Sequence, residues 1–164
     1  MITEEQITKG IIVHSLRKED IVVDYRARAW CKLTYPGHSK GCPNWGKREG
    51  CPPKAKLFEQ IVKPPFTLVA VKFNLDEHAR RMKEKHPDWS DRQVRCVLYW
   101  QGKLDKKLRE ESEKVASKIL NSHIVYKPEA HGIHLFKTCE NIGLMLERNP
   151  QNILWKMTIV GIKK

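Results

Sequence analysis

Residues 31–53 constrain what this chain can fold into more than any other stretch. Four prolines and four glycines fall within these 23 residues, a density that excludes a long helix or a central strand there. The same stretch contains Cys31, Cys42 and Cys51, three of the five cysteines of the chain. We call it the cysteine segment and expect a loop of turns that needs an added constraint to hold one shape.

Positive charge is concentrated on the same region. The whole chain carries a net charge of +12. Residues 26–56 hold eight cations against the single acid Glu49, so they carry +7, and the other 133 residues share the remaining +5. The eight cations are Arg26, Arg28, Lys32, Lys40, Lys47, Arg48, Lys54 and Lys56.

The chain of 164 residues, 40% of them hydrophobic, is the size of one ordinary globular domain, and we expect a single domain over 1–164. The first residues contain Glu4 and Glu5 where a signal peptide has basic residues, and no stretch approaches the ~20 apolar residues of a membrane span. These features predict a cytoplasmic protein without membrane contact. Cysteines in a reducing compartment are typically metal ligands, redox groups or core residues.

The first half of the chain shows five local patterns. We expect a helix over residues 2–10 opened by Thr3, a strand over 21–25 and a loop over the cysteine segment. Apolar residues at helical spacing predict a helix over 55–62 that ends at Pro64 and Pro65. Strict alternation predicts a strand over 67–75.

The second half favours helices and a terminal hairpin. We expect a charged helix over residues 76–85, a long helix over 90–120 that breaks, if anywhere, at Gly102, a strand over 123–126 and a helix over 133–141. Residues 144–148 and 153–162 have the pattern of a hairpin that turns at 149–152. The expected fold is α+β, a small mixed or antiparallel sheet packed against helices, with a Cys/Gly/Pro-rich metal-binding loop. The apolar stripe of the long helix would also allow a homodimer.

The cysteine segment has the composition of a metal site. Zinc and iron–sulfur clusters are held by thiolates, and a loop of glycine and proline can turn several sulfur atoms toward one point. Nearby Lys and Arg side chains lower thiol pKa values and offset the charge of a thiolate cluster. The alternative without a function is that these cysteines are buried packing residues, but such cysteines usually lie within a regular apolar pattern.

Two stretches carry a resemblance. Residues 42–53 read C-P-N-W-G-K-R-E-G-C-P-P, and residues 129–138 read E-A-H-G-I-H-L-F-K-T. They resemble a family of predicted metal-binding proteins of unknown function (domain of unknown function 2284), whose motifs are C-P-x-Y-G-K-x-W-x-C-P-P and E-A-C-G-I-D-V-F-x-T. The resemblance implies one metal or cluster bound by the cysteine segment.

The chain departs from that family pattern at four points. Trp45 replaces a tyrosine, Glu49 lies near the place of a tryptophan, and ten residues separate Cys31 from Cys42, more than the family usually has between its first two cysteines. The family's second cysteine cluster is absent, since only residues 121–128 lie there. His131 occupies the position of a later cysteine, which makes it the first choice as a fourth ligand beside Cys31, Cys42 and Cys51.

Other fourth ligands stay open at this point. The candidates are His38, His134, Cys96 and Cys139, and an open position for substrate is a further alternative. Cys139 fits the inward stripe of its helix, which favours core packing, and Cys96 lies beside Val94 and Val97 in the same way.

Three functions follow from these patterns. The first is a metalloprotein with a 4Fe-4S cluster or zinc and a redox or Lewis-acid role. The second is an RNA or single-stranded nucleic-acid binder with a structural metal, because cations interleaved with Trp45 and other aromatic residues suit phosphates and bases. The third is an enzyme acting on RNA or an anionic small molecule, with Lys47 or Arg48 on a phosphate. The expected anion-binding residues are Arg26, Arg28, Lys32, Lys40, Lys47, Arg48, Lys54 and Trp45.

Overall fold

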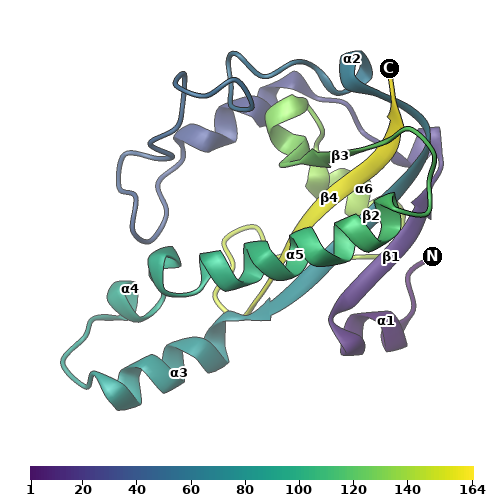
Figure 1. Ribbon diagram of the computed structural model, residues 1–164. Helices are drawn as coiled ribbons and strands as arrows, with labels where there is room; N and C mark the ends of the chain where they lie inside the picture. Colours follow the sequence, from purple (N-terminus) through teal and green to yellow (C-terminus); the bar gives the residue numbers. More distant parts are fainter.

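The computed structural model describes residues 1–164 and has an α+β fold around one antiparallel sheet (Figure 1). Its four strands lie in the order β1-β2-β4-β3. Their bounds are β1 (Ile11–Leu16), β2 (Val62–Asn74), β3 (Ser122–Tyr126) and β4 (Ile153–Lys163). The sequence left open a mixed or an antiparallel sheet, and the three pairings are all antiparallel.

Six α-helices and four short 3-10 helices surround the sheet. The α-helices are α1 (Glu4–Lys9), α2 (Phe58–Ile61), α3 (Leu75–Lys85), α4 (Asp91–Val94), α5 (Gln101–Ala116) and α6 (Leu135–Asn141). The 3-10 helices are η1 (Lys18–Asp20), η2 (Tyr25–Lys32), η3 (Val97–Tyr99) and η4 (Pro128–His131). None of the helices is long and apolar enough to cross a membrane.

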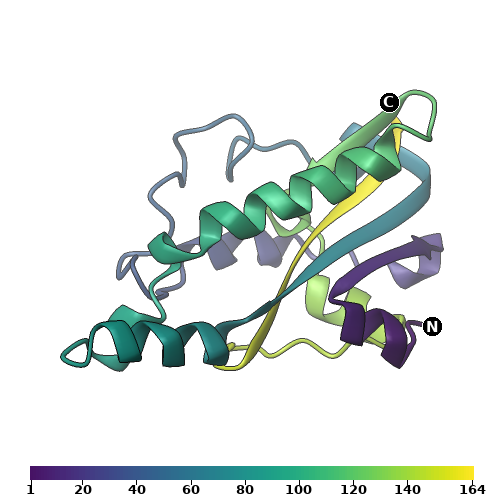
Figure 2. The ribbon, with the colours of Figure 1, turned by 60° about the horizontal axis from the view of Figure 1, so that its bottom comes forward.

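Both faces of the sheet are covered, which explains why β2 is buried along its middle. Leu68 and Ala70 point into a core cluster that includes Ile133 and Cys139, whereas Val69 and Val71 point into a second cluster. Successive side chains of a strand alternate between faces, so a strand in the middle of a three-layer fold is apolar on both sides. Figure 2 shows α5 crossing one face of the sheet while α6 lies on the other.

Several elements have the local chemistry that the sequence predicted. Thr3 caps α1 through a reciprocal capping box with Gln6, and Gly10 ends it in the left-handed conformation. The strand predicted over 67–75 is the main part of β2, and the helix predicted over 76–85 is α3. The expected strand over 123–126 is β3, and the helix over 133–141 is α6.

Two predictions in the first half were wrong. Residues 21–25 form no strand, and only an isolated bridge links Val23 to Ile133. The helix expected over 55–62 is the single turn α2, and the chain then runs through Pro64 and Pro65 as part of β2. Proline lacks the N–H that a ladder requires. It is tolerated here because the pairing of β1 with β2 begins only at Phe66, and the pairing with β4 shifts register between Lys63 and Thr67.

The long helix predicted over 90–120 is broken before Gly102, which lies inside α5. The interruption at residues 95–100 lies against the cysteine segment. The N–H of Val97 is 3.4 Å from the carbonyl oxygen of Pro36, and a Cβ at Gly37 would lie 2.9 Å from the Cys96 sulfur. A contact with another part of the chain, rather than a local helix breaker, therefore ends the first helical piece.

The hairpin predicted at the C-terminal end was half wrong. β4 forms as expected, but residues 144–148 form no strand. Leu144 is buried in the core cluster below the sheet, and the Glu147 carboxylate accepts backbone N–H groups from Gln151, Asn152 and Ile153. These hydrogen bonds fix the turn before β4, and the residues that precede it form no second strand.

Candidate functional site

The cysteine segment begins in η2 and then forms a loop of turns, as its glycine and proline content predicted. An isolated antiparallel bridge between Tyr35 and His38 closes one of these turns. Figure 1 shows the segment crossing the top of the molecule near η2 and η4. The guanidinium of Arg28 ties it down, since it donates hydrogen bonds to the carbonyl oxygens of Pro53, Ala55 and Ala130.

The three cysteines of the segment share one neighbourhood. The N–H of Cys42 donates a 2.7 Å hydrogen bond to the carbonyl oxygen of Cys31. This bond closes the loop between the two cysteines. Burial raises the pKa of the Cys31 thiol, and the charges of Glu129, Cys42 and Cys51 raise it further. Cys51 is the most buried of the three, with 8% of its surface exposed.

Gly41 allows the chain to return to Cys31 and close this loop. It has a φ of 80°, and a Cβ at this position would lie 2.7 Å from the backbone carbon and oxygen of Lys32. A side chain is therefore excluded both by conformation and by the approach of the two backbones. The glycine is thus a requirement for placing Cys42 beside Cys31.

The donor atoms suit a thiophilic metal by type, since one segment supplies three thiols and the charges of Cys42, Cys51 and Glu129 act on Cys31. No group of three or more His, Cys, Asp or Glu side chains converges with the geometry of a metal site, however. Assembly of a metal centre would therefore require the sulfur atoms of the segment to move closer together.

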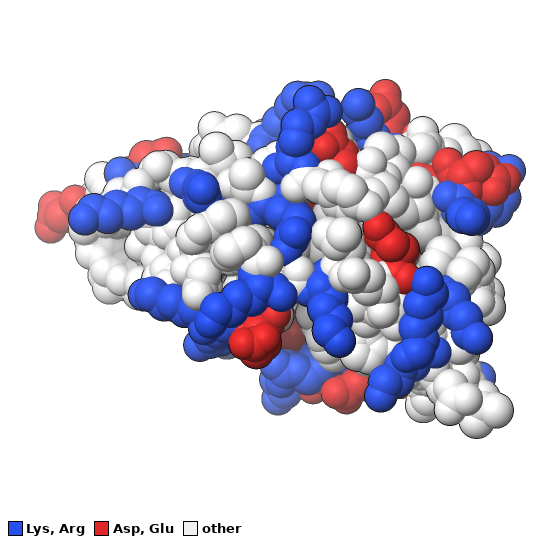
Figure 3. Space-filling view, turned by 90° about the horizontal axis from the view of Figure 1, so that it is seen from above, with Lys and Arg blue, Asp and Glu red and all other residues white.

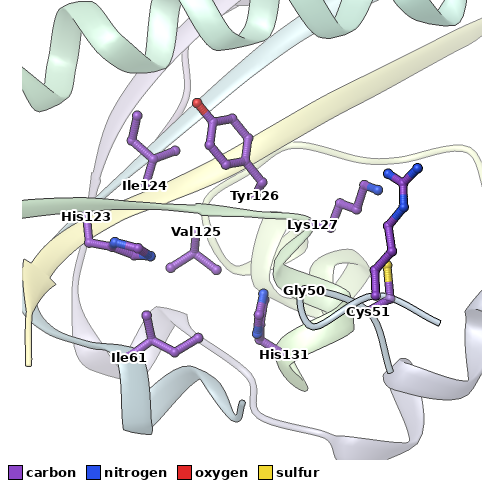
Figure 4. Close-up of a pocket in the computed structure, with 10 residues that line it drawn as sticks. Gly50, Cys51, Ile61, His123, Ile124, Val125, Tyr126, Lys127 and His131 are labelled. Carbon is purple, nitrogen blue, oxygen red and sulfur yellow. The ribbon is translucent and has the colours of Figure 1, made fainter. Parts of the chain in front are cut away.

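A cavity of about 450 Å³ borders Cys51 on the side of β3 (Figure 4). His123 and Val125 project into it from β3 on the side of Ile61 and His131, while Tyr126 points the other way. Arg48 and Lys127 also line the cavity, and no acidic residue does. Its chemistry suits a small anion with an apolar part.

A backbone carbonyl just beyond the cysteine segment fixes the ring of His131. Its Nδ1 lies 2.6 Å from the carbonyl oxygen of Lys56, and because a carbonyl only accepts, Nδ1 must donate. Burial lowers the pKa of His131, and the charges of Arg28 and His123 lower it further. Hydrogen bonds to the backbone of Lys56 and of Tyr126 act in the opposite direction and raise the pKa. A metal at Nε2, the ring nitrogen that does not contact Lys56, would need this histidine to exchange its contact with Tyr126.

The residue that sequence reasoning missed is Glu129. It lies at the start of η4, two positions before His131, and its charge acts on Cys31. Burial raises the pKa of its carboxyl group. The E-A-H-G stretch contains both Glu129 and His131, but the family resemblance points only to the histidine.

The other candidate ligands are engaged elsewhere. His38 packs edge-on against Tyr35, and His134 accepts the N–H of Lys137 at the start of α6. Cys96 lies against Gly37. Cys139 is fully buried beside Met157, and burial raises the pKa of its thiol to about 12.

The cations expected to bind anions divide into two groups. Arg26 pairs with Asp24, Arg28 is held by backbone carbonyls, and the ammonium of Lys32 lies 4.4 Å above the ring of Trp45. The other four are exposed and form no ion pair; they are Lys40, Lys47, Arg48 and Lys54. Figure 3 shows the top face of the molecule with many more basic than acidic side chains.

The aromatic rings near these cations already pack against other side chains, so they offer little open surface for stacking a base. Trp30 packs edge-on against His134 and Phe136, and Tyr35 packs against the second core cluster. One face of Trp45 is covered by Lys32. Phosphate contacts are thus available on this segment, whereas open faces for stacking bases are few.

Comparison of the chain with known proteins identifies no related protein. No protein-family model matches the chain, and no curated protein or solved structure is significantly similar to it. The resemblance of the two cysteine and histidine motifs to a metal-binding family therefore stays a prediction.

Proposed function

We propose that the protein binds a thiolate-ligated metal centre, zinc or a 4Fe-4S cluster, through Cys31, Cys42 and Cys51. The observation that supports the proposal is the backbone hydrogen bond from Cys42 to Cys31, together with the electrostatic effect of Cys42 and Cys51 on the Cys31 thiol, in a segment that consists of turns beyond η2. Thiols that only pack usually lie in helices or strands of the core, as Cys139 does. A metal is the constraint that such a loop lacks.

Two residues of η4 are the nearest additional donors to consider. His131 is the choice that the sequence suggested, and its Nε2 would bind a metal in exchange for its contact with Tyr126. Glu129 acts electrostatically on Cys31 and has no salt-bridge partner. We propose that one of these two side chains completes the coordination, because both are fixed on the element against which η2 packs.

The cavity beside Cys51 would receive the anionic partner of such a centre. Arg48 and Lys127 form no ion pair with any acid, so their charges remain available. Lys127 has a φ of 53°, a left-handed conformation that is uncommon for lysine. We propose an anionic small molecule as the ligand, held next to the metal by these two cations.

The experiment is purification without oxygen, followed by elemental analysis and an absorption spectrum. Broad absorption near about 400 nm with iron and sulfide indicates a cluster, and about one equivalent of colourless zinc indicates a zinc site. Serine variants of Cys31, Cys42 and Cys51 should each lose most of the metal. The matched control is Cys96→Ser, which removes a half-buried thiol outside the segment and should leave the metal content unchanged.

Full-length folded protein without stoichiometric metal after anaerobic purification and reconstitution would contradict the proposal. A metal that all four serine variants retain equally would also overturn it. Glu129→Gln and His131→Gln then separate the two additional donors, since only the ligand's variant should weaken the metal's affinity.

The alternative function, RNA binding by the cysteine segment with a structural metal, has narrower support. The four exposed cations favour phosphate contacts, but Trp30, Tyr35 and Trp45 are already packed. Alanine substitution of Lys40, Lys47 and Lys54 together would weaken RNA binding if the segment is the contact surface, and would leave it unchanged otherwise.

A further inference from the structure

A second cavity of about 450 Å³ lies between α3 and α5, and the cysteine segment contributes nothing to its lining. Figure 2 shows the two helices on the same side of the sheet, with α5 running above α3. Its walls come from both helices and from η3, and its floor comes from the end of β2. It is the size of a site for one small molecule.

The walls of this cavity, which we call the α3–α5 cleft, carry unpaired positive charge. Arg81 and Lys85 lie one helical turn apart on α3, and Lys103 and Lys107 lie one turn apart on α5. None of these four side chains takes part in an ion pair, although ion pairs occur elsewhere on both helices. No acidic residue lines the cleft.

The floor of the cleft is aromatic. The rings of Phe73 and Trp100 are stacked, with centroids 4.8 Å apart and planes inclined by 19°. Tyr99 lies at the rim with 51% of its surface exposed. Trp100 is buried, so the aromatic surface open to a ligand is the half-buried ring of Phe73 and the ring of Tyr99, which also packs against Trp89 with centroids 5.1 Å apart. A partly exposed aromatic surface next to several cations is the combination that accepts a planar base and its phosphates.

One nitrogen in the cleft lacks a partner. Nε2 of His78 is buried and makes no hydrogen bond, while the ring lies 5.6 Å from that of Phe73. Buried polar atoms of folded proteins are nearly always satisfied. A hydrogen-bonding group of a ligand seated over Phe73 would satisfy this nitrogen.

We infer that the α3–α5 cleft binds a nucleotide unit, its base on the aromatic floor and its phosphates between the two pairs of cations. Two sources share this chemistry, a free nucleotide and a single-stranded nucleic acid. Charge alone would bind any polyanion, whereas Phe73, Tyr99 and His78 add contacts that only a base can use. The inference does not depend on the metal centre, because the two sites share no lining residue.

The test measures binding of three probes to the full chain by titration: ATP, a ten-residue oligouridylate and inorganic triphosphate. ATP or the oligonucleotide should bind at least tenfold more tightly than inorganic triphosphate. Tighter binding of ATP than of the oligonucleotide identifies a free nucleotide as the ligand, and the reverse order identifies a strand.

Variants then locate the site. The pair Lys103→Ala and Lys107→Ala should weaken binding about tenfold or more and reduce the slope of log affinity against log salt by about 1.4 for a single strand. Tyr99→Ala should weaken it about fivefold. The matched control pair is Lys106→Ala and Lys114→Ala, which removes the same charge from the same helix but outside the cleft.

Three results would overturn the inference. One is no binding of ATP or the oligonucleotide at low salt by protein with a native circular dichroism spectrum. Another is an equal loss in the cleft pair and the control pair, which would indicate attraction by net charge alone. The third is binding of inorganic triphosphate as tight as that of ATP, which would show that the aromatic floor takes no base.

Discussion

The guanidinium of Arg28 donates a 2.7 Å hydrogen bond to the carbonyl oxygen of Ala55, and so joins η2 to the chain just beyond the cysteine segment. The same group reaches the carbonyls of Pro53 and Ala130. An arginine that composition alone suggested as an anion ligand is therefore a structural tie. It fixes the loop against η4, where His131 and Glu129 lie.

Replacing Arg28 should loosen the cysteine segment. Arg28→Met keeps the aliphatic stem but removes every donor, and the loss of hydrogen bonds from a charged group should cost about 2 kcal/mol of unfolding free energy. Amide hydrogen exchange of residues 53–56 should accelerate more than that of the sheet. The control is Arg26→Met, whose partner Asp24 lies beside it on the surface, and it should change stability little. Equal effects of the two variants would contradict the structural role of Arg28.

A buried hydroxyl pair links α5 to β4. Ser112 and Thr158 are both fully buried, and their oxygen atoms are 2.7 Å apart. Ser112→Ala should cost about 1–3 kcal/mol, because it leaves the Thr158 hydroxyl without this partner. The double variant with Thr158→Val should recover part of that loss, and denaturant unfolding of the four proteins of the cycle measures it. Strict additivity of the two substitutions would show that the hydroxyls do not interact.

The five thiols should differ in reactivity. Because burial raises the pKa of Cys139 to about 12, its thiol stays protonated at pH 8 and should resist alkylation in the folded protein. Mass spectrometry after brief treatment with iodoacetamide should find Cys96 labelled and Cys139 unlabelled. Full labelling of Cys139 before unfolding would mean that α6 is not packed as described.

The same shift predicts the direction of a pH effect. The folded state keeps the Cys139 thiol neutral, whereas the unfolded chain ionises it from its ordinary pKa of 9.0. The stabilising contribution is therefore complete below that pKa and decreases as pH rises toward about 12. Cys139→Ala should cost stability at neutral pH because it leaves a cavity, and the difference from the parent should shrink in alkaline buffer.

Glu147 should have the opposite pH dependence. Hydrogen bonds from the backbone N–H groups of Ile153, Asn152 and Gln151 lower the pKa of its carboxyl group. The stabilisation is present above the ordinary carboxyl pKa and is lost as pH falls through the lowered one. Glu147→Ala should therefore reduce the melting temperature at pH 7 but not near pH 2. Glu140→Ala removes an exposed carboxylate without hydrogen bonds, and its melting curve should match that of the parent at both values.

Local signals in the sequence were sufficient for particular elements. Thr3, Gln6 and Gly10 define both ends of α1 with groups from the helix itself, and the alternation of Val69, Val71 and Phe73 defines β2. The interior position of Cys139 followed from the spacing of its helix. For the candidate site, proline and glycine content was enough to predict a loop of turns, whereas the choice of the three cysteines as ligands stays a prediction.

Other features depended on contacts between distant parts of the chain. The interruption near Cys96 follows from its contact with Gly37, and the passage of β2 through Pro64 and Pro65 follows from where β1 stops pairing. Glu129 is part of the E-A-H-G motif, yet only its burial and its electrostatic effect on Cys31 distinguish it from a surface acid.

The sequence by itself determined which segment carries three of the five thiols and that residues 26–56 carry +7 of the net charge of +12, because proline, glycine, cysteine and lysine act there through local conformation and composition. Only the tertiary structure decided which charges are free. It pairs Arg26 with Asp24 and Arg28 with backbone carbonyls, and it brings Arg81, Lys85, Lys103 and Lys107 to one cleft with an aromatic floor. Charge acts through space, and the distances between groups on different elements are set by packing rather than by their spacing along the chain.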